Sequence, residues 1–333
     1  MSSWNQIQLR EYLNTNCHIH FELLITAVSY ENRGLESVRQ LLLHFQIDKT
    51  ILISFGTKYL SEELSSKWME QKEKLKLLFR EYGVDYELYE CNLTNYYQFK
   101  EKYSFKYENT IINITTFPKN WILMLSKQYD DASNIFFYLL DSSRMPTEEE
   151  LDIGLKEIVV VDGFEGEISI ATDVLLVLIL GYEGHRTISF LSNFPCDKIL
   201  PILSIPIKGN EDEDKKYYDN VHTCNWDLLN KNSVIRKRDS KFHTISSLNH
   251  VEFYHQLKQI IETYKSEGMD VCISPLGTKV QTLGLYLYCR KHPETQIVYS
   301  IPIKRVDITE NVDNCNIDDL INKCFIFKLP QGI

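Results

Sequence analysis

The chain has 333 residues, 44% of them hydrophobic and 25% charged, with a formal net charge of −10 and an isoelectric point near 5.5. This composition is typical of a soluble globular protein of about two domains. It excludes fibrous and disordered classes, and it argues against extensive binding of duplex DNA, which needs a wide basic surface. The longest apolar run, Val174 to Leu180, is far short of the roughly 20 residues of a transmembrane helix. Because the N-terminus also lacks a secretory signal pattern, we expect a cytoplasmic protein with no membrane association.

Apolar strand patterns alternate with amphipathic helix patterns through the first half of the chain. The predicted strands cover residues 21–28, 48–54, 86–89, 110–114 and 134–138. The predicted helices cover residues 35–45, 64–82 and a segment around Trp121. Residues 1–20 indicate a short leading helix, and residues 145–150 indicate a turn and a helix start between the two halves.

The second half repeats this order. Its predicted strands cover residues 173–180, 197–204, 271–273 and 296–299, with helical stretches after the first and the third. Tyr30-Glu31 recurs as Tyr182-Glu183, 152 residues later, and the other matching elements recur at spacings of 149 to 162 residues. Four consecutive elements at such similar spacings indicate two copies of one unit. We therefore predict an α/β fold class with two tandem, diverged Rossmann-like units, each a mainly parallel sheet covered by helices.

The repeat divides the chain near its middle. We expect an N-terminal Rossmann-like unit over residues 1–150 and a C-terminal unit over residues 151–333. The second unit carries a polar insert around residues 208–247, where the first unit has a helix and a further strand. Its charge runs are typical of solvated loop, although a stretch this long within a compact domain is more often functional or mobile than filler.

The eight cysteines are scattered and show no C-x-x-C spacing, which indicates reduced and mostly buried thiols. The one cluster with metal-binding character is Cys17-His18-Ile19-His20, where two histidines fall on one face of a strand. No third ligand lies nearby in the sequence. We expect no metal site and no cofactor.

One strand-to-helix loop has the composition of an anion site. In a doubly wound sheet, ligands bind beyond the carboxyl ends of the strands, where loops lead into helix N-termini. Ser274 ends a strand, Gly277 permits close backbone approach, Thr278 can cap the helix, and Lys279 adds a positive charge beside the helix dipole. The alternative is a tight turn with a capping threonine and a solvent lysine. The loop is not a P-loop, since the G-x-x-x-x-G-K spacing is absent.

The loop from Gly181 to Arg186 is a second candidate. Its two glycines let the backbone approach a ligand, and Tyr182 can stack on a base. Glu183 can bind ribose hydroxyls or a base edge, and Arg186 can bind phosphate in a bidentate manner. The alternative is a helix N-terminal turn in which Glu183 complements the dipole and Arg186 lies at the surface.

The same pattern recurs in the first copy as Tyr30-Glu31 followed by Arg33, which favours the ligand-binding interpretation. His185, Glu183 and Arg186 are the candidates for catalysis, but no Ser-His-Asp or Cys-His arrangement can be assembled from the local sequence. Whether the protein is an enzyme stays open.

The segment from Ser274 to Lys279, with its strand, Gly-Thr-Lys and helix, resembles the CRISPR-associated Rossmann-fold (CARF) sensor domains, whose ligand loop often reads T-G-G-T-K. Pro275-Leu276 departs from that pattern. In the first copy Thr115, Thr116 and Lys119 match, while Pro118 stands in place of glycine. When the two halves are superposed, we expect Tyr30 over Tyr182 and Thr115 near Ser274. Two such units in one chain are similar to the fused pair of the SAVED sensors of cyclic-oligonucleotide antiphage systems.

The resemblance implies a sensor of bacterial antiphage defence that binds a nucleotide-derived, anionic second messenger. The loops of both units would hold the ligand in a pseudo-symmetric cleft, and the output would lie in an effector protein partner. Two alternatives stay open: an enzyme that acts on a nucleotide or phosphodiester, in the manner of a ring nuclease, and a protein-interaction subunit of a defence complex. The sequence leaves open the identity of the ligand, its turnover, the partner and the oligomeric state.

Overall fold

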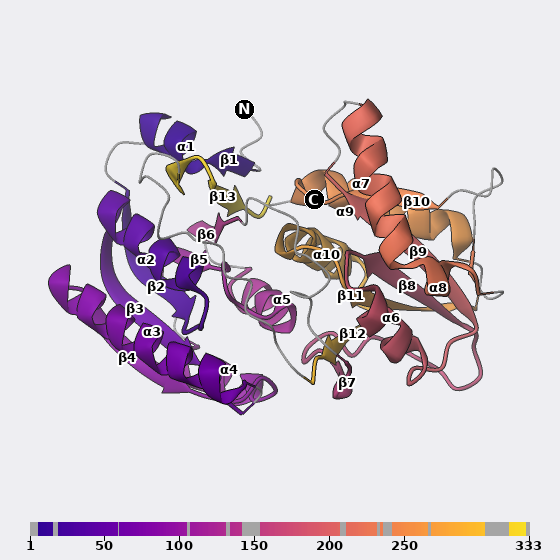
Figure 1. The fold of residues 1–333 in the computed structure, drawn as a ribbon, viewed down its shortest axis with the longest axis horizontal. Coiled ribbons are helices and arrows are strands. Elements are labelled where there is room, and N and C mark those ends of the chain that lie inside the picture. The colour runs from indigo at the N-terminus through magenta and orange to yellow at the C-terminus, as the bar shows by residue number, and fades with distance from the viewer. Residues whose placement is uncertain are drawn as a thin grey trace. The chain divides into compact units, whose positions relative to one another are not determined.

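Two units make up the chain in the computed structural model (Figure 1). Contacts group Met1–Trp121, Gln128–Glu150 and Val306–Ile333 into a first unit, and Ile122–Lys127 with Leu151–Arg305 into a second. The structure describes residues 6–15, 19–58, 60–104, 107–130, 134–141, 154–206, 211–231, 234–235, 242–265, 268–303 and 320–330. Within these ranges, no helix is both long and apolar enough to cross a membrane.

The described strands of the first unit form one sheet in the order β1-β13-β6-β5-β2-β3-β4. Strands β2 to β6 pair in parallel, whereas β13 is antiparallel to β6 and β1 is antiparallel to β13. The strand bounds are β1 Gln6–Gln8, β2 His20–Ala27, β3 Gln46–Ser54, β4 Asp85–Glu90, β5 Asn109–Asn113, β6 Asn134–Leu140 and β13 Cys324–Lys328. The helix bounds are α1 Leu9–Thr15, α2 Asn32–His44, α3 Glu62–Glu81, α4 Tyr96–Lys102 and α5 Lys119–Gln128.

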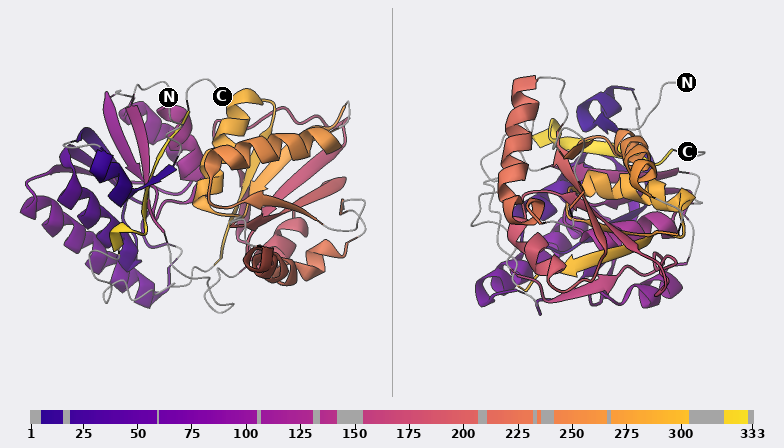
Figure 2. Two further views of the ribbon diagram at one scale, coloured as in Figure 1. Left: turned by 90° about the horizontal axis from the view of Figure 1, so that it is seen from above. Right: turned by 90° about the vertical axis from the view of Figure 1, so that its right-hand side faces the viewer.

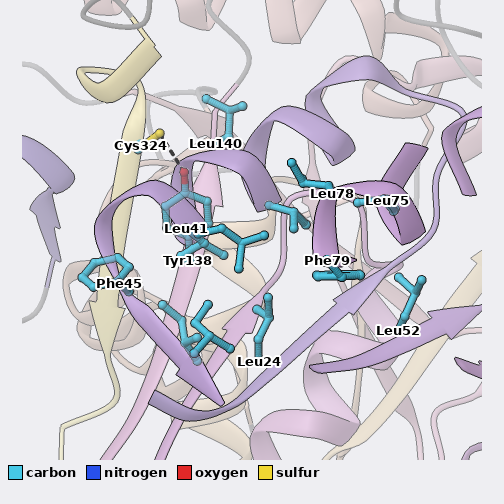
Figure 3. Close-up of a cluster of buried hydrophobic side chains, with 14 of the residues drawn as sticks. Leu24, Leu41, Phe45, Leu52, Leu75, Leu78, Phe79, Tyr138, Leu140 and Cys324 are labelled. Atoms are coloured by element: carbon cyan, nitrogen blue, oxygen red, sulfur yellow. Dashed lines mark hydrogen bonds between the residues drawn. The ribbon is translucent and has the colours of Figure 1, made fainter. Parts of the chain in front are cut away.

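Helices cover both faces of this sheet, which is why its central strands are almost continuously apolar. On one face, Leu41 of α2 and Phe79 of α3 pack with strand residues such as Leu24 and Tyr138 (Figure 3). The Tyr138 hydroxyl donates to the Cys324 thiol over 2.9 Å, as the dashed line in Figure 3 shows. The other face carries a cluster of aromatic rings from α4, α5 and the strand ends.

The described strands of the second unit follow the order β10-β9-β8-β11-β12-β7. All pair in parallel except β7, which is antiparallel to β12. The strand bounds are β7 Glu157–Val160, β8 Val174–Leu180, β9 Lys198–Ile205, β10 His243–Ser246, β11 Asp270–Pro275 and β12 Gln296–Ile301. The helix bounds are α6 Gly184–Leu191, α7 Glu211–Cys224, α8 Trp226–Leu229, α9 His250–Tyr264 and α10 Lys279–Lys291. In the left view of Figure 2, α9 and α10 lie on one side of this sheet and α6 and α7 on the other.

The two sheets share one topology, which confirms the predicted fold class. The order β4-β3-β2-β5-β6 in the first unit corresponds to β10-β9-β8-β11-β12 in the second, and each series continues into an antiparallel strand. Matching Tyr30 with Tyr182 makes Ile25 of the first unit equivalent to Val177 of the second. Ile25 pairs with Ile112, and Val177 pairs with Ile273, so Ile112 and Ile273 are equivalent. The residues that follow them, Asn113 and Ser274, are therefore equivalent as well.

This register also identifies the residue of the first unit that is equivalent to Ser274. The pairing matches Ser274 with Asn113, two residues before Thr115, which we expected near Ser274. On the neighbouring strands, Ala27 pairs with Ile53 and Ile179 pairs with Ile202. Two residues further along, Phe55 is therefore equivalent to Ser204.

The polar segment 208–247 is not an insert. It contains α7, α8 and β10, and β10 pairs in parallel with β9 just as β4 pairs with β3. These elements are the counterparts of α3 and β4. The sequence pattern conceals them because α7 is strongly polar and β10 spans only His243–Ser246, too short for a clear alternating pattern.

The chain termini also differ from the sequence expectation. Strand β13 pairs with β6, so the end of the chain belongs to the first sheet rather than to a unit over residues 151–333. Gln6–Gln8 forms β1 before the leading helix α1, because β13 offers it a strand edge that is distant in sequence. The predicted turn and helix start over residues 145–150 lie outside the described residues.

Candidate functional site

Two strand-to-helix loops of the second unit meet at the carboxyl edge of its sheet. A Cβ atom added at Gly181, after β8, would lie 3.1 Å from the Leu276 carbonyl oxygen and 3.7 Å from the Gly277 Cα atom, after β11. The structure thus brings the segments Gly181–Arg186 and Ser274–Lys279 together. Small residues permit this approach, because a side chain at either glycine would meet backbone or polar atoms of its neighbours.

The N-terminus of α10 is closed by a capping box. The Thr278 hydroxyl accepts a hydrogen bond from the Gln281 N–H over 3.3 Å, and Gln281 Oε1 accepts one from the Thr278 N–H over 2.8 Å. The same hydroxyl donates to the Ser247 carbonyl over 2.9 Å. A methyl group at Gly277 would overlap Gln281 Oε1. Thr278 and Gly277 therefore each have a structural role, as the alternative interpretation of this loop expected.

Two serines at the carboxyl ends of β9 and β11 have buried hydroxyls, and the strand register places their side chains on opposite faces of the sheet. Ser274, at the end of β11, is fully buried, and Ser204, at the end of β9, is 5% exposed. Within the described residues, neither hydroxyl has a hydrogen-bond partner. A Cβ atom added at Gly277 would lie 2.9 Å from Ser204 Oγ. Leaving a buried hydroxyl unsatisfied costs about 1–3 kcal/mol.

Ser204 is not among the residues predicted from the sequence, where it is only the last residue of an apolar strand. A comparison of the two repeats could have indicated it, since a serine at position 204 stands where the first unit has Phe55. Lys279, which the sequence did single out, is the first residue of α10 and is partly exposed. Its charge adds to the positive end of the helix dipole.

Arg186 does not lie at the surface, and it does not present its guanidinium to a ligand. Its side chain is 3% exposed and donates to Glu183 over 2.6 Å and to Ser300 Oγ over 2.9 Å. It also donates to the Ser300 carbonyl and lies over the Tyr299 ring. Arg186 therefore ties the β8–α6 loop to the end of β12 and holds the Glu183 carboxylate in place.

The start of α6 is covered by the junction of α7 and α8. A methyl group at Gly184 would overlap the Cys224 carbonyl oxygen, and the Asn225 side chain donates to the Gly181 carbonyl over 2.8 Å. Tyr182 is partly buried beside this junction, and burial raises the pKa of its hydroxyl to about 12. Of the three catalytic candidates, Glu183 and Arg186 bind each other, whereas His185 is exposed on α6.

In the first unit, the matching loops have their polar side chains engaged. Glu31 occupies the N-cap position of α2, as Glu183 does for α6, and it forms an ion pair with Arg33. The Thr115 hydroxyl accepts from the Leu140 N–H over 3.0 Å, and the Thr116 hydroxyl donates to the Ala27 carbonyl over 3.4 Å. Two further predicted residues complete the set: Tyr30 is buried after β2, and Lys119 is partly exposed as the first residue of α5.

Aromatic rings fill the space above the first sheet at this edge. The Phe55 ring lies 4.9 Å from the Trp121 ring and 6.1 Å from the Phe117 ring, centroid to centroid. Phe117 is 1% exposed and Trp121 is fully buried. Ser204 is the equivalent of Phe55, so the same place in the second unit carries a hydroxyl instead of a ring.

The metal and thiol expectations concern other parts of the chain. Cys17 and His18 lie outside the described residues, and His20 Nε2 lies 2.7 Å from Asp48. Where the chain is described, no three side chains of the metal-binding types gather at one point. None of the six described cysteines forms a disulfide. Burial raises the pKa of Cys272, Cys289 and Cys324, as expected for thiols inside a fold.

Comparisons with known proteins give a structural likeness without a sequence match. No family model matches the chain, and no curated protein matches its sequence. The chain is similar to a solved structure of a type III CRISPR defence DNA nuclease activated by cyclic oligoadenylate, with 11% sequence identity and a TM-score of 0.48, over 92% of this chain and 70% of that chain. At a TM-score below 0.5 this likeness assigns no residue a role, so the roles of the site residues rest on this chain's own geometry.

Proposed function

We propose that the chain is a sensor of bacterial antiviral defence whose second unit binds a nucleotide-derived anionic ligand. The observation that carries this proposal is the buried hydroxyl of Ser204 against the Gly277 turn, which has no hydrogen-bond partner within the described part of the chain. Nucleotide sensing and the defence setting come from the resemblance of Gly277-Thr278-Lys279 to the CARF ligand loop.

The chemistry of this edge suits a phosphoryl group. The Ser204 hydroxyl is a hydrogen-bond donor that the described protein groups leave unused, and a phosphate oxygen is a strong acceptor for it. The α10 N-terminus supplies the positive end of a helix dipole, and Lys279 supplies a full charge beside it. These three sources of attraction act on the same small region.

A nucleotide is proposed rather than a simple anion because the loop next to the Gly277 turn carries an aromatic residue, Tyr182. Tyr182 follows Gly181, and Gly181 lies against the Gly277 turn. A base or ribose that extends from the bound phosphate has the Tyr182 ring and the Gly181 backbone within the same loop pair. Stacking on an aromatic ring of this kind contributes about 1–3 kcal/mol per base.

The acidic and basic groups of the Gly181–Arg186 loop bind each other, which favours ligand binding without turnover. Glu183 and Arg186 neutralise each other, and Arg186 is further held by Ser300. A general acid–base pair would need a carboxylate or imidazole directed at the ligand. The proposed protein is therefore a binding protein that passes its signal to a separate effector protein.

The test is a nucleotide analysis followed by a binding panel. The purified protein is denatured, and the released nucleotides are identified by mass spectrometry. Cyclic and linear oligonucleotides of two to six residues are then titrated by calorimetry. We expect at least one to bind, and Lys279→Ala to weaken that binding. Failure of every nucleotide to bind would refute the sensor proposal, and conversion of a bound nucleotide during incubation would replace it with the enzyme alternative.

A further inference from the structure

We infer that the loop before β8 is a docking surface for a protein partner that has an apolar cleft rimmed by lysine and arginine. Residues 168–172, called the isoleucine tip, carry this inference. The tip precedes β8, whereas Gly181 follows β8, so the tip lies at the opposite edge of the second sheet from the candidate ligand site. That the partner is the effector protein rests on the proposed function.

Two isoleucines of the tip are exposed to solvent. Ile170 is fully exposed, and Ile168 is 38% exposed. The Thr172 N–H donates to the Ser169 carbonyl over 3.4 Å, which makes Ile170 a corner residue of a β-turn. Proline, glycine, asparagine, aspartate and serine dominate such corners. Because Ile170 is fully exposed, it adds no packing to the described part of the chain.

Hydrogen bonds fix the tip to the start of β11. The Asp270 carboxylate accepts from the Ser169 N–H over 2.7 Å and from the Thr172 hydroxyl. The Ser169 hydroxyl accepts from the Ala171 N–H over 3.2 Å. The two donors to Asp270 lower the pKa of its carboxyl, so these bonds are charge-assisted at neutral pH. The isoleucines therefore stand on an ordered support, which reduces the entropy lost on docking.

The segment that leads to the tip is fixed to the start of β12. The Glu167 N–H donates to the Glu294 carbonyl over 2.9 Å, and the Gln296 side chain donates to the Glu165 carbonyl over 2.9 Å. Gly166 has a φ of +60°, and a Cβ atom added there would lie 2.4 Å from the Gln296 backbone nitrogen. Only glycine permits this approach, so the backbone holds the tip at one place on the sheet edge.

The charge of this loop determines the kind of partner. Residues 163–173 contain Glu165, Glu167 and Asp173 and no lysine or arginine. Asp270 adds another carboxylate at the tip itself, and Lys265 Nζ is already paired with Glu294 over 3.4 Å. Electrostatic complementarity therefore favours a basic rim around the cleft that receives the isoleucines.

The same charge disfavours two other occupants. An anionic membrane surface attracts basic segments and repels an acidic one. A second copy of the chain carries the same net charge of −10, so docking of the acidic loop on it opposes like charges. A separate, basic protein partner fits both the apolar and the acidic character of the tip.

The experiment places a photo-crosslinking residue at the tip. The full chain, with p-benzoylphenylalanine in place of Ile170, is expressed in its native host cells and irradiated. The matched control carries the same residue in place of Leu77, which is 61% exposed on α3 of the first unit. Proteins joined to either position are identified by mass spectrometry. We expect a protein joined at position 170 and not at position 77, and this protein is then purified.

Binding of the purified partner is titrated by biolayer interferometry. Ile170→Asp should weaken binding at least about thirtyfold and Ile170→Ala about tenfold, because each removes an apolar side chain from the cleft. Leu77→Asp should stay within about twofold of wild type. A rise from about 50 to about 500 mM salt should weaken wild-type binding, and Glu167→Gln should reduce this salt dependence. The melting temperature of Ile170→Asp should equal that of wild type, because the side chain is fully exposed.

The outcomes decide between the possible occupants. The docking surface is overturned if no protein is joined at position 170, or if the partner binds Ile170→Asp as well as wild type. Dimers in sedimentation that Ile170→Asp dissociates would make the occupant a second copy and overturn the inference. Binding that does not respond to salt would overturn the basic rim.

A nucleotide titration separates this inference from the proposed function. Ile170→Asp should bind nucleotides as wild type does, because Gly181 and Gly277 lie at the other edge of the sheet. A chain that docks on the partner but binds no nucleotide of the panel would refute the sensor proposal and leave the docking surface standing.

Discussion

Ser204→Ala should make the protein more stable and a weaker binder at the same time. The Ser204 hydroxyl is buried and lacks a partner among the described residues, so its removal relieves a desolvation penalty of about 1–3 kcal/mol. The loss of packing of one oxygen atom offsets part of this gain, which leaves a net stabilisation of about 1 kcal/mol. For a unit of this size, that corresponds to a rise of about 2–4 °C in melting temperature.

The same change should weaken ligand binding about ten- to a hundredfold. A hydroxyl that donates to a charged phosphate oxygen contributes about 1.5–3 kcal/mol, and each 1.4 kcal/mol corresponds to a factor of about ten in affinity. A gain in stability at the expense of binding is the pattern expected of a residue kept for function. A structural serine would show the opposite change in stability.

Scanning calorimetry measures the first effect, and titration with 5′-AMP measures the second. Thr50→Val serves as the control, because it should raise stability in the first unit without a change in affinity. A melting temperature for Ser204→Ala several degrees below that of wild type would show that the hydroxyl stabilises the fold. Unchanged affinity would show that it does not contact the ligand.

Four further predictions concern charge, packing, acid stability and thiol reactivity. Lys279→Ala should lower affinity for anionic nucleotides about ten- to a hundredfold in titrations, with stability within about 0.5 kcal/mol of wild type in urea unfolding; an unchanged affinity would leave it a solvent lysine. Gly184→Ala should destabilise the second unit by about 1–3 kcal/mol in calorimetry, because its methyl group would overlap the Cys224 carbonyl oxygen, and a neutral effect would refute that contact. Lys102 and two neighbouring groups lower the pKa of Glu87 from 4.5 to about 2. The stability that this carboxylate contributes is therefore present above about pH 4.5 and lost as the pH falls towards 2. In urea unfolding at several pH values, Glu87→Gln should reduce the loss of stability over this pH range, and an unchanged loss would contradict the prediction. With iodoacetamide and peptide mass spectrometry, the exposed Cys224 should be modified in the native protein, whereas three buried thiols should react only after unfolding: Cys272, Cys289 and Cys324.

The central strands, most of the helices between them and the repeat spacing follow from the sequence, because period and spacing are local properties. The Tyr-Glu pairs after β2 and β8 anchored the match between the halves, and in both halves the glutamate occupies the N-cap position of the next helix. The segment Ser274–Lys279 was predicted as a strand-to-helix turn with a capping threonine, and the structure shows a capping box at Thr278. Each of these features depends on residues within a few positions of one another.

The tertiary structure decided which distant residues meet. Strand β13 joins β6 across the whole chain, because the edge of the first sheet offers unpaired backbone groups. Arg186 faces Ser300 rather than solvent, a contact that no local pattern encodes. The position of Ser204 against Gly277, and of Phe55 at the equivalent place, depends on strand register over many residues. The sequence therefore shows the composition of each loop. Which side chains face that loop, and hence whether it can bind an anion, is decided only by the pairing of strands.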